Sequence, residues 1–270
     1  MKARALVLLG PGTNRDRDVG EAIESVGGEA FVLPISHLAS TRLSEFGMLV
    51  IPGGFSYGDA LGAGALLALD LERRFAEEVA HFVSSGRPVL GICNGFQALV
   101  KSGILPGFAT GRGEAELAAE LASARPRERE LTLARNARGL FECRWVRLAV
   151  PPSRSIWTRD IGSFACPVAH GEGRLVGKDA EVLDRLQAAA QVALVYARAD
   201  GSPAEGAWPE NPNGSARDIA GLCNAEGNVL GLMPHPENAV RPRTRFDSDR
   251  GNDLIVKKFF ENGVKFARAL

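Results

Sequence analysis

One stretch of the sequence organises the rest of the chain, and it reads Arg87-Pro88-Val89-Leu90-Gly91-Ile92-Cys93-Asn94-Gly95-Phe96-Gln97. The apolar run 88–92 predicts a short parallel strand that is buried on both faces. Helix-forming residues follow over 96–101. Between them, Gly91-x-Cys93-x-Gly95 has the spacing of a nucleophile elbow. In such a turn a strained residue carries the nucleophile, and glycine on both sides avoids a collision.

The role of Cys93 has two interpretations at this point. As a nucleophile, its sulfur lies at a helix N-terminus, where the partial positive charge of the backbone favours the reactive thiolate. As a structural residue, it is one more buried cysteine of the core, and the glycines only shape the turn. The stretch by itself leaves both interpretations open.

Composition narrows the class of protein. The 32 Lys and Arg residues balance 32 Asp and Glu residues, so nothing indicates a nucleic acid or an acidic membrane as partner. No apolar run is long enough to span a bilayer, and the start of the sequence has no signal-peptide pattern. The four cysteines are scattered without a C-x-x-C pair, which predicts neither a zinc site nor a disulfide framework. We therefore expect a cytoplasmic protein without a bound metal.

Strand and helix patterns alternate through the first hundred residues. Strands are expected at 5–9, 30–33, 47–51 and 88–92, and helices at 16–26 and 73–85. This alternation predicts an α/β fold with a mostly parallel sheet flanked by helices. Ligands of such sheets bind beyond the carboxyl ends of the strands. The loops that follow Gly10, Pro52 and Ile92 are therefore expected along one edge.

The second half of the chain has a different pattern. Residues 113–130 predict a solvated helix or surface insertion, and 253–270 an amphipathic closing helix with Leu254, Ile255, Phe259 and Phe260 on or near one face. A strand is expected at 141–145, a helix at 180–190, a strand at 192–196 and a hairpin from 219–223 and 229–233. We expect one domain over 1–270, with the insertion at 113–130.

A cysteine nucleophile needs a base, and the base needs an orienting group. His235 lies in Met233-Pro234-His235-Pro236-Glu237, directly after an apolar strand. Extended backbone there would place Glu237 on the same side as the imidazole. The alternative is a proline-stiffened surface loop with an incidental His and Glu. His37 and His81 fit a solvated surface better.

The third component of the candidate active site, after the nucleophile and its base, is the stretch Pro52-Gly53-Gly54-Phe55-Ser56-Tyr57-Gly58-Asp59. Acyl transfer from an amide produces an oxyanion that backbone N–H groups must stabilise. The amide of Asn94, at the start of the helix, and that of Gly53 or Gly54 are the candidates. A phosphate-binding glycine loop is the competing interpretation, but no Lys-Ser/Thr pair follows and no G-x-G-x-x-G is complete.

Together, Gly-Ile-Cys93-Asn-Gly and Pro-His235-Pro-Glu237 resemble the class I (triad) glutamine amidotransferases. Further motifs resemble one branch of that family, the glutaminase subunits of phosphoribosylformylglycinamidine synthases. They cover most of the chain and keep their order: Gly12-Thr-Asn-Arg15, Gly53-Gly-Phe-Ser-Tyr-Gly-Asp59, Phe141-Glu-Cys-Arg-Trp-Val146, Ala169-His-Gly-Glu-Gly173 and Asn211-Pro-Asn-Gly-Ser215. The resemblance implies a flavodoxin-like three-layer fold with an antiparallel extension.

The resemblance also implies roles for individual residues. Cys93 would be the nucleophile, His235 the general base and acid, and Glu237 the orienting carboxylate. Gln97 resembles a residue that contacts glutamine. The stretch His170-Gly171-Glu172 resembles a segment whose backbone holds the α-amino and carboxylate groups of the substrate, although His170 fits a structural polar residue of a turn equally well. The segment 211–215 is expected to form a turn. Only the resemblance implies that it contacts a partner or the glutamine pocket.

The implied activity is divided between subunits. This chain would hydrolyse glutamine to glutamate and ammonia without a cofactor of its own. A separate synthetase subunit would use ATP, Mg²⁺ and the ammonia to convert phosphoribosylformylglycinamide to phosphoribosylformylglycinamidine in purine synthesis. A small accessory subunit stays open as a further partner. The segments 113–130 and 151–157 diverge from compact members, which affects how the partner would dock rather than the triad.

Three other functions compete with this one. The chain could serve a synthetase that makes GMP, CTP or carbamoyl phosphate, but the motifs at 141–146 and 169–173 argue against it. It could be a silent regulatory subunit, although such a protein has no chemical reason to keep Cys93, His235 and Glu237 together. It could also be a cysteine hydrolase or chaperone-like relative that acts on another amide or aldehyde. Turnover of glutamine but not of other amides separates these functions.

Overall fold

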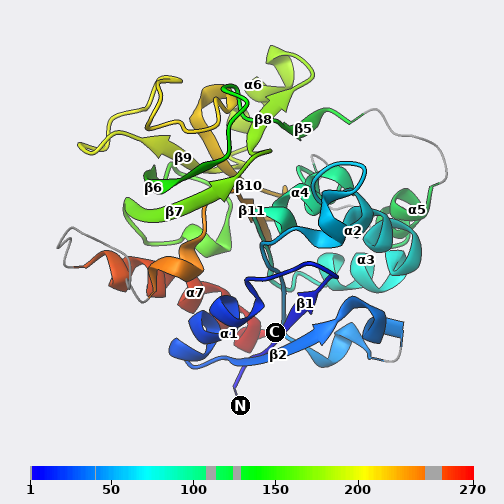
Figure 1. The fold of residues 1–270 in the computed structure, drawn as a ribbon. Helices are drawn as coiled ribbons and strands as arrows, with labels where there is room; N and C mark the ends of the chain where they lie inside the picture. Colours follow the sequence, from blue (N-terminus) through cyan, green and yellow to red (C-terminus); the bar gives the residue numbers. More distant parts are fainter. Residues whose placement is uncertain (1, 40, 108–113, 124–128, 241–250) are drawn as a thin grey trace.

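The computed structural model describes residues 2–39, 41–107, 114–123, 129–240 and 251–270, and its α/β fold is organised around one large sheet (Figure 1). The strands are β1 (Arg4–Leu9), β2 (Glu29–Pro34), β3 (Met48–Ile51), β4 (Val89–Ile92), β5 (Leu131–Ala134), β6 (Glu142–Ala149), β7 (Phe164–His170), β8 (Arg174–Gly177), β9 (Val192–Ala197), β10 (Ile219–Cys223) and β11 (Val229–Leu232). The helices are α1 (Asp16–Ser25), α2 (Ala65–Leu69), α3 (Ala76–Ser84), α4 (Asn94–Lys101), α5 (Glu114–Ala122), α6 (Ala180–Ala188) and α7 (Asn252–Ala269).

Five neighbouring strands form the parallel half of the sheet, in the order β2-β1-β3-β4-β11. β3, β4 and β11 are buried along their whole length, as parallel strands covered on both faces must be. α1 and α7 pack against each other on one face, while α3 and α4 lie on the other (Figure 1). The predicted α/β arrangement with a parallel sheet between helices is confirmed.

The remaining four strands of the sheet, β10, β9, β6 and β7, extend it with antiparallel pairings. The predicted hairpin is present as β10 and β11, and the predicted antiparallel extension is confirmed. The sequence pattern does not predict β7, because Pro167 argues against a strand. β7 is an edge strand, so the N–H that a proline lacks is not needed by a further neighbour. β5 and β8 pair separately as a two-stranded sheet.

The carboxyl ends of four adjacent parallel strands lie side by side. β1 ends before Gly10, β3 before Pro52, β4 before Cys93 and β11 before the Met233–Glu237 stretch. The registers pair Val7 with Val50, Ile51 with Gly91, and Ile92 with Leu232. The loops that carry the candidate residues therefore share one edge, as predicted.

α7 closes the molecule over the sheet. Phe259 and Phe260 are fully buried, and Ile255 is partly buried. Leu254 is 66% exposed, so the prediction that places it on or near the buried face is wrong. The first turn of α7 is held by polar contacts instead, because Asn252 accepts the N–H of Ala165 at 2.6 Å and donates to its carbonyl at 2.9 Å.

The segment 151–157, which diverges in sequence, contributes to the core beneath α7. Trp157 is fully buried, and its ring lies 5.7 Å from that of Phe259. A Cβ at Gly263 would lie 2.2 Å from the Trp157 ring, so this helical glycine makes room for the indole. The indole N–H donates to the carbonyl of Asn228 at 3.2 Å. The segment therefore fastens α7 to the turn before β11.

The predicted insertion at 113–130 contains α5. Leu117 and Leu121 are buried where α5 packs against α3, so part of this segment belongs to the core rather than to solvent. Residues 113 and 124–128 of the prediction lie outside the described residues. That the whole chain forms one domain stays a prediction.

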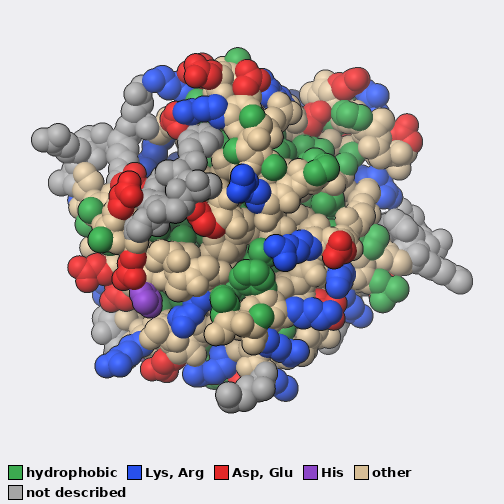
Figure 2. Space-filling model, turned by 180° about the vertical axis from the view of Figure 1, so that it is seen from behind, with side chains coloured by type: hydrophobic (Ala, Val, Ile, Leu, Met, Phe, Trp, Pro, Cys, Tyr) green, Lys and Arg blue, Asp and Glu red, His purple; other side chains and the backbone are tan. Residues whose placement is uncertain are grey.

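The molecular surface carries mixed charge. Figure 2 shows Lys and Arg side chains interspersed with Asp and Glu on the back of the molecule. Among the described helices, none is both long enough and apolar enough to cross a membrane.

Candidate active site

The nucleophile elbow is present at the end of β4. Cys93 has φ +50° and ψ −102°, a strained conformation for a residue with a side chain. It directly precedes α4, and its backbone is held by a 2.8 Å hydrogen bond from its N–H to the carbonyl of Leu232. The flanking glycines serve close packing: a Cβ at Gly95 would lie 1.9 Å from the Ile51 carbonyl oxygen, and one at Gly91 would lie 2.9 Å from Gly95. The two glycines allow this close packing, and the residue that adopts the strained backbone conformation is Cys93.

His235 and Glu237 meet beside this elbow. Nδ1 of His235 lies 2.7 Å from Oε1 of Glu237, and both side chains are buried. The predicted extended geometry is wrong, because Pro236–Ala239 forms a short 3₁₀ turn. The two side chains converge nevertheless, and Nε2 of His235 has no hydrogen-bond partner among the described residues. That nitrogen is therefore available for the thiol or for a substrate.

The protonation of His235 follows from its neighbours. Burial alone would lower the pKa of the imidazole, but the Glu237 carboxylate and the Cys93 side chain outweigh it and raise this pKa to about 10. Opposite charge stabilises the protonated ring in a site from which water is excluded. His235 is thus a cation at neutral pH, next to the sulfur of Cys93.

This charge arrangement predicts the titration of His235. Its NMR signal should titrate with a midpoint near pH 10, far above the ordinary value of about 6.5. Glu237→Gln removes the carboxylate charge but keeps an acceptor for Nδ1, so the midpoint should fall. The chain has four histidines, and a His235→Gln variant assigns the signal. A wild-type midpoint between pH 6 and 7 would contradict the proposed ion pair.

Gly53 and Gly54 bring the end of β3 against the elbow. A Cβ at Gly53 would lie 2.7 Å from Cε1 of His235 and 3.4 Å from the Cβ of Cys93, so only glycine fits between these two side chains. Gly54 has φ +142° and packs on the backbone of Thr13 and Asn14. The structure thereby places Gly53, one of the two glycines predicted to supply an oxyanion N–H, against Cys93, and Gly54 lines the same cavity as Cys93.

The side chain of Asn94 ties α4 to the loop after Gly54. Its Oδ1 accepts the N–H of Ser56 at 3.1 Å, and its Nδ2 donates to Asp59 at 3.2 Å and to Gln97 at 3.0 Å. Because the side chain is fully engaged, only the backbone N–H of Asn94 suits the predicted oxyanion role. This function of the Asn94 side chain was not predicted from the sequence. The only local signal for it is the presence of an Asn directly after the nucleophile.

Gln97 and Glu172 meet across the site. Nε2 of Gln97 donates to the carbonyl of Glu172 at 2.5 Å, and Oε2 of Glu172 accepts the N–H of Ala63 at 3.2 Å. Together with Cys93 and the glycine loop they surround a cavity of about 260 Å³. All residues predicted to bind substrate line it: Gln97, His170, Gly171 and Glu172.

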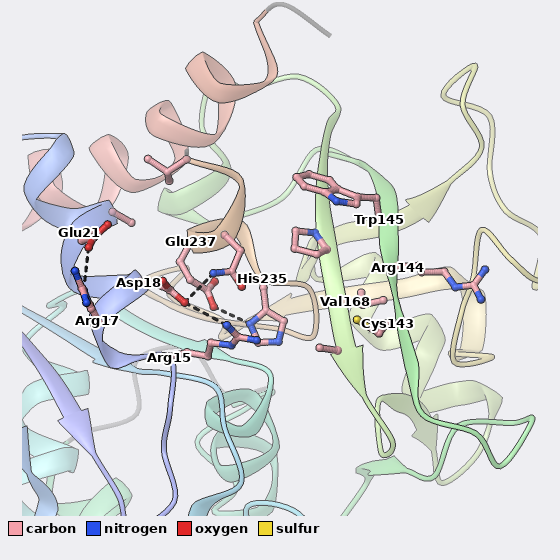
Figure 3. A pocket seen from close by; sticks show the side chains of 15 residues that line it. Arg15, Arg17, Asp18, Glu21, Cys143, Arg144, Trp145, Val168, His235 and Glu237 are labelled. Carbon is pink, nitrogen blue, oxygen red and sulfur yellow. Dashed lines mark hydrogen bonds and ion pairs between the residues drawn. The ribbon is translucent and has the colours of Figure 1, made fainter. Parts of the chain in front are cut away.

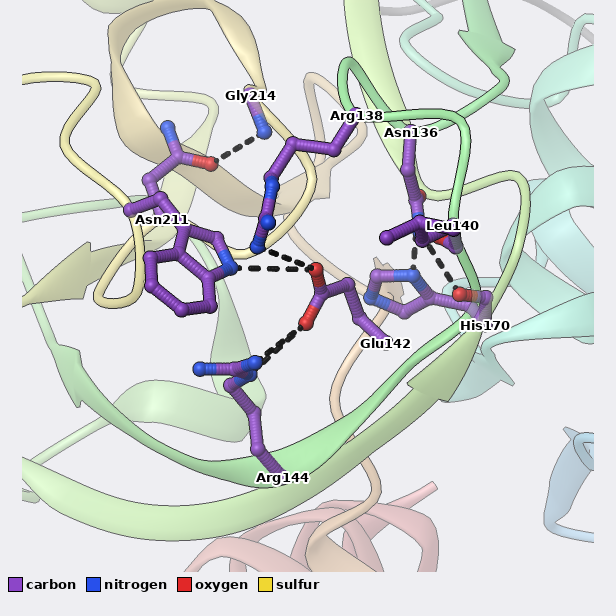
Figure 4. A network of polar contacts seen from close by, with 9 residues as sticks. Asn136, Arg138, Leu140, Glu142, Arg144, His170, Asn211 and Gly214 are labelled. Atoms are coloured by element: carbon purple, nitrogen blue, oxygen red, sulfur yellow. Dashed lines mark hydrogen bonds and ion pairs between the residues drawn. The ribbon is translucent and has the colours of Figure 1, made fainter.

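A buried network holds the turn that follows β7. His170 is neutral, because burial and the nearby His235 lower its pKa to about 4. Its Nδ1 donates to Oδ1 of Asn136 at 3.2 Å, and its Nε2 accepts from Nδ2 of Asn213 at 3.5 Å. Asn136 also donates to the carbonyl of His170 (Figure 4). Its Oδ1 in addition accepts the N–H of Gly173 at 3.1 Å. Asn136 therefore fixes both ends of the turn, and sequence reasoning missed it.

A second network lies behind the first. The buried Glu142 at the start of β6 accepts from Arg144 at 2.9 Å and from the indole N–H of Trp208 at 3.2 Å (Figure 4). The guanidinium groups of Arg138 and Arg144 lie 4.1 and 4.6 Å from the Trp208 ring. Glu142 pairs with His170 in the β6–β7 register. The charged cluster thus braces the strand that carries His170, which accounts physically for much of the motif 141–146.

A second cavity of about 590 Å³ is lined by His235 and Glu237. Figure 3 shows Arg15 and Asp18 on one of its sides and Cys143 and Trp145 on the other. Asp18 pairs with Arg15 at 3.3 Å and accepts from Asn238, next to Glu237, at 2.9 Å. These contacts let α1 brace the turn that carries Glu237.

The cysteines differ in accessibility. Cys93, Cys166 and Cys223 are all buried, but of these three only Cys93 lines the 260 Å³ cavity. Burial raises the pKa of the Cys166 and Cys223 thiols, that of Cys223 to about 12. Cys143 lies on strand β6 and is exposed, so small reagents can reach its thiol.

A glutamine-shaped diazo-ketone should therefore label Cys93 rapidly and the other three cysteines slowly. Cys166 and Cys223 are buried and line neither of the two cavities. Cys143 is accessible but does not line the 260 Å³ cavity that contains Gln97 and Glu172. Iodoacetamide, which has no glutamine framework, is the control and should also label Cys143. Peptide mass mapping that places the diazo-ketone mainly on another cysteine would refute the assignment of Cys93.

Within the part of the chain that the structure describes, no three His, Cys, Asp or Glu side chains are grouped so that they could hold a metal ion. The fold and the Cys93–His235–Glu237 arrangement define a cysteine-dependent amide hydrolase of the α/β class. Comparison with known proteins gives the family.

The profile of the CobB/CobQ-like glutamine amidotransferase domain matches residues 2–267, and the chain belongs to that family. Its relatives include proteins named phosphoribosylformylglycinamidine synthase subunit PurQ. The one from Treponema denticola is 51% identical over 98% of this chain and 99% of its own length. The one from Dehalococcoides mccartyi is 40% identical over 99% and 98%. A chain of the solved structure of PurLQS from Thermotoga maritima is 32% identical, with a TM-score of 0.72 over 98% of this chain and 99% of that one.

Proposed function

We propose that this chain is the glutaminase subunit of a phosphoribosylformylglycinamidine synthase. The observation that carries the proposal is the position of Cys93 beside the hydrogen-bonded His235–Glu237 pair, with Gly53 packed between Cys93 and His235. The chain also matches PurQ subunits over nearly its whole length. It hydrolyses glutamine, and a synthetase subunit uses the ammonia to convert phosphoribosylformylglycinamide to phosphoribosylformylglycinamidine.

The chemistry proceeds through a thioester. The sulfur of Cys93 attacks the side-chain amide carbon of glutamine, and protonated His235 gives a proton to the departing nitrogen, which leaves as ammonia. His235, now neutral, accepts a proton from water as the water attacks the thioester. Glutamate leaves, and the Cys93–His235 pair is restored. Glu237 holds Nδ1 and stabilises the imidazolium in both steps.

The oxyanion of each tetrahedral intermediate is stabilised by backbone N–H groups. Asn94 provides one at the start of α4, and Gly53 or Gly54 provides the other. Their positions depend on the contacts of Asn94 with Ser56 and Asp59, since these join α4 to the loop that follows the two glycines.

The chain needs no cofactor for this reaction, because thiol, imidazole and water supply all the groups that react. ATP and Mg²⁺ act in the synthetase subunit, where the formyl amide oxygen is activated. We place the activity in the cytoplasm, since a cysteine nucleophile must remain reduced and the four cysteines of this chain are free.

The decisive experiment is co-purification with the synthetase from the native host, followed by an assay of amidine formation. The complex should form phosphoribosylformylglycinamidine from glutamine, ATP and phosphoribosylformylglycinamide. Replacing the synthetase by one that makes GMP or CTP should give no glutamine-dependent product. Glutamine hydrolysis that supports one of those enzymes, but not amidine formation, would overturn the proposal.

A further inference from the structure

The substrate cavity contains charged side chains that the thioester chemistry does not use. Asp59 lies on the loop after Gly54, Glu172 on the turn after β7, and Arg135 on the loop before β6, and all three line the 260 Å³ cavity together with Cys93. That volume is slightly below the roughly 300 Å³ at which ligand pockets usually begin, so it suits a single amino acid better than a peptide.

The two carboxylates repel each other. Burial and then the charge of Glu172 raise the pKa of Asp59 above its ordinary value. Lys101 also acts on Asp59, but more weakly than Glu172 does. Like charges in one site are stabilised when a cation lies between them, and the α-ammonium group of an amino acid is such a cation.

The carboxylates are held in place by the protein. Asp59 accepts from Asn94 at 3.2 Å, and Glu172 accepts the N–H of Ala63 at 3.2 Å. The carboxylate of Asp59 also accepts the backbone N–H of Gly64. A carboxylate has about four acceptor positions, so both groups keep acceptor capacity for a ligand. Arg135, in contrast, is exposed and makes no ion pair with any residue that the structure describes. Its guanidinium group is free to take the α-carboxylate of a ligand as a bidentate partner.

We propose that Asp59 and Glu172 bind the α-ammonium group of glutamine and that Arg135 binds its α-carboxylate. This inference rests on the proposed glutaminase function. It makes the cavity selective for a zwitterionic amino acid, since an amide that lacks either charge leaves a charged side chain of the cavity without its partner.

Asp59→Asn tests this assignment cleanly. Asp59 has φ +54°, and Asn tolerates the left-handed region as well as Asp does. The amide oxygen of the new side chain can still accept from Asn94, so the substitution removes the charge and little else. Glu172→Gln likewise keeps an acceptor for Ala63.

The assay uses the complex with the synthetase and measures ammonia release from three amides. Glutamine carries both charges, glutaramate lacks the α-ammonium group, and glutaminamide lacks the α-carboxylate. Asp59→Asn and Glu172→Gln should lower kcat/KM for glutamine by about 10- to 100-fold, mainly through KM. Turnover of glutaramate should change by less than about threefold. Arg135→Gln should lower turnover of glutamine and glutaramate but not that of glutaminamide.

Asp200→Asn is the matched control, because Asp200 lies on an exposed loop and is hydrogen-bonded to Ser202. It should leave all three values unchanged. A loss in Asp59→Asn and Glu172→Gln that is equal for glutamine and glutaramate would overturn the inference, since it would assign the carboxylates a structural role. Failure of the wild-type complex to hydrolyse glutamine would instead refute the proposed function.

Discussion

Cys93→Ala and His235→Ala are expected to abolish glutamine-dependent amidine synthesis, with losses of about 10⁴-fold or more. Without the sulfur no thioester forms. Without the imidazole, no base accepts the proton of the thiol and no acid protonates the leaving nitrogen. Glu237→Ala should cost less, because Glu237 orients the ring at 2.7 Å and supplies charge but does not touch the substrate.

The control for these variants is synthesis with free ammonium. We expect it to survive in all three, because the synthetase chemistry lies in the partner subunit. Circular dichroism and gel filtration of the complex check folding and assembly. Loss of ammonium-dependent synthesis in Cys93→Ala, with folding and assembly intact, would contradict the division of labour between the subunits.

The second large effect is activation by the partner. We expect the chain alone to be a poor glutaminase and the synthetase to raise its turnover by about 100-fold, which corresponds to about 2.7 kcal/mol in the transition state. One oxyanion donor that moves into place accounts for an effect of this size. Unregulated hydrolysis would release ammonia into water, where it is protonated and no longer nucleophilic.

The loop after Gly54 is the element on which we expect the partner to act. Tyr57, Asp59 and Leu61 all have φ between +54° and +63°, a costly conformation for residues other than glycine. Four large apolar side chains near this loop are exposed: Phe55, Leu61, Leu140 and Phe141. Phe55, Leu140 and Phe141 line the cavity, and Leu61 lies on the same loop as Phe55. A partner that covers these apolar side chains would bias the loop and the N–H groups beside it.

Glutamate release measures this activation, first from the chain alone and then with the synthetase, ATP and phosphoribosylformylglycinamide. Leu61→Ser should reduce the activation without changing the basal rate. Leu254→Ser is the matched control, because Leu254 is also exposed but lies on α7. Equal turnover with and without the partner would show that the site is already assembled in the free chain.

The local features of this protein could be predicted from its sequence. The apolar run that ends at Ile92, the glycines on both sides of Cys93 and the proline-flanked His235 each carry their signal within a few neighbouring residues. Parallel strands expose their carboxyl ends at one edge of the sheet, so the strand pattern also placed these three features together. The hairpin of β10 and β11 was predictable for the same reason, because a short polar turn joins two apolar strands.

Tertiary structure alone decided what surrounds these residues. The β6–β7 pairing joins segments that no local pattern links, and it brings Asn136 to His170 from 34 residues away. The exposure of Cys143 and Leu254 depends on what packs over them rather than on their own hydrophobicity. Asp59 and Glu172 share a cavity because two loops meet there. The burial and the charge of a site depend on the whole fold, because distant segments of the chain supply the neighbouring groups. The reactive residues and their turns, in contrast, are specified by residues that are close to them in the sequence.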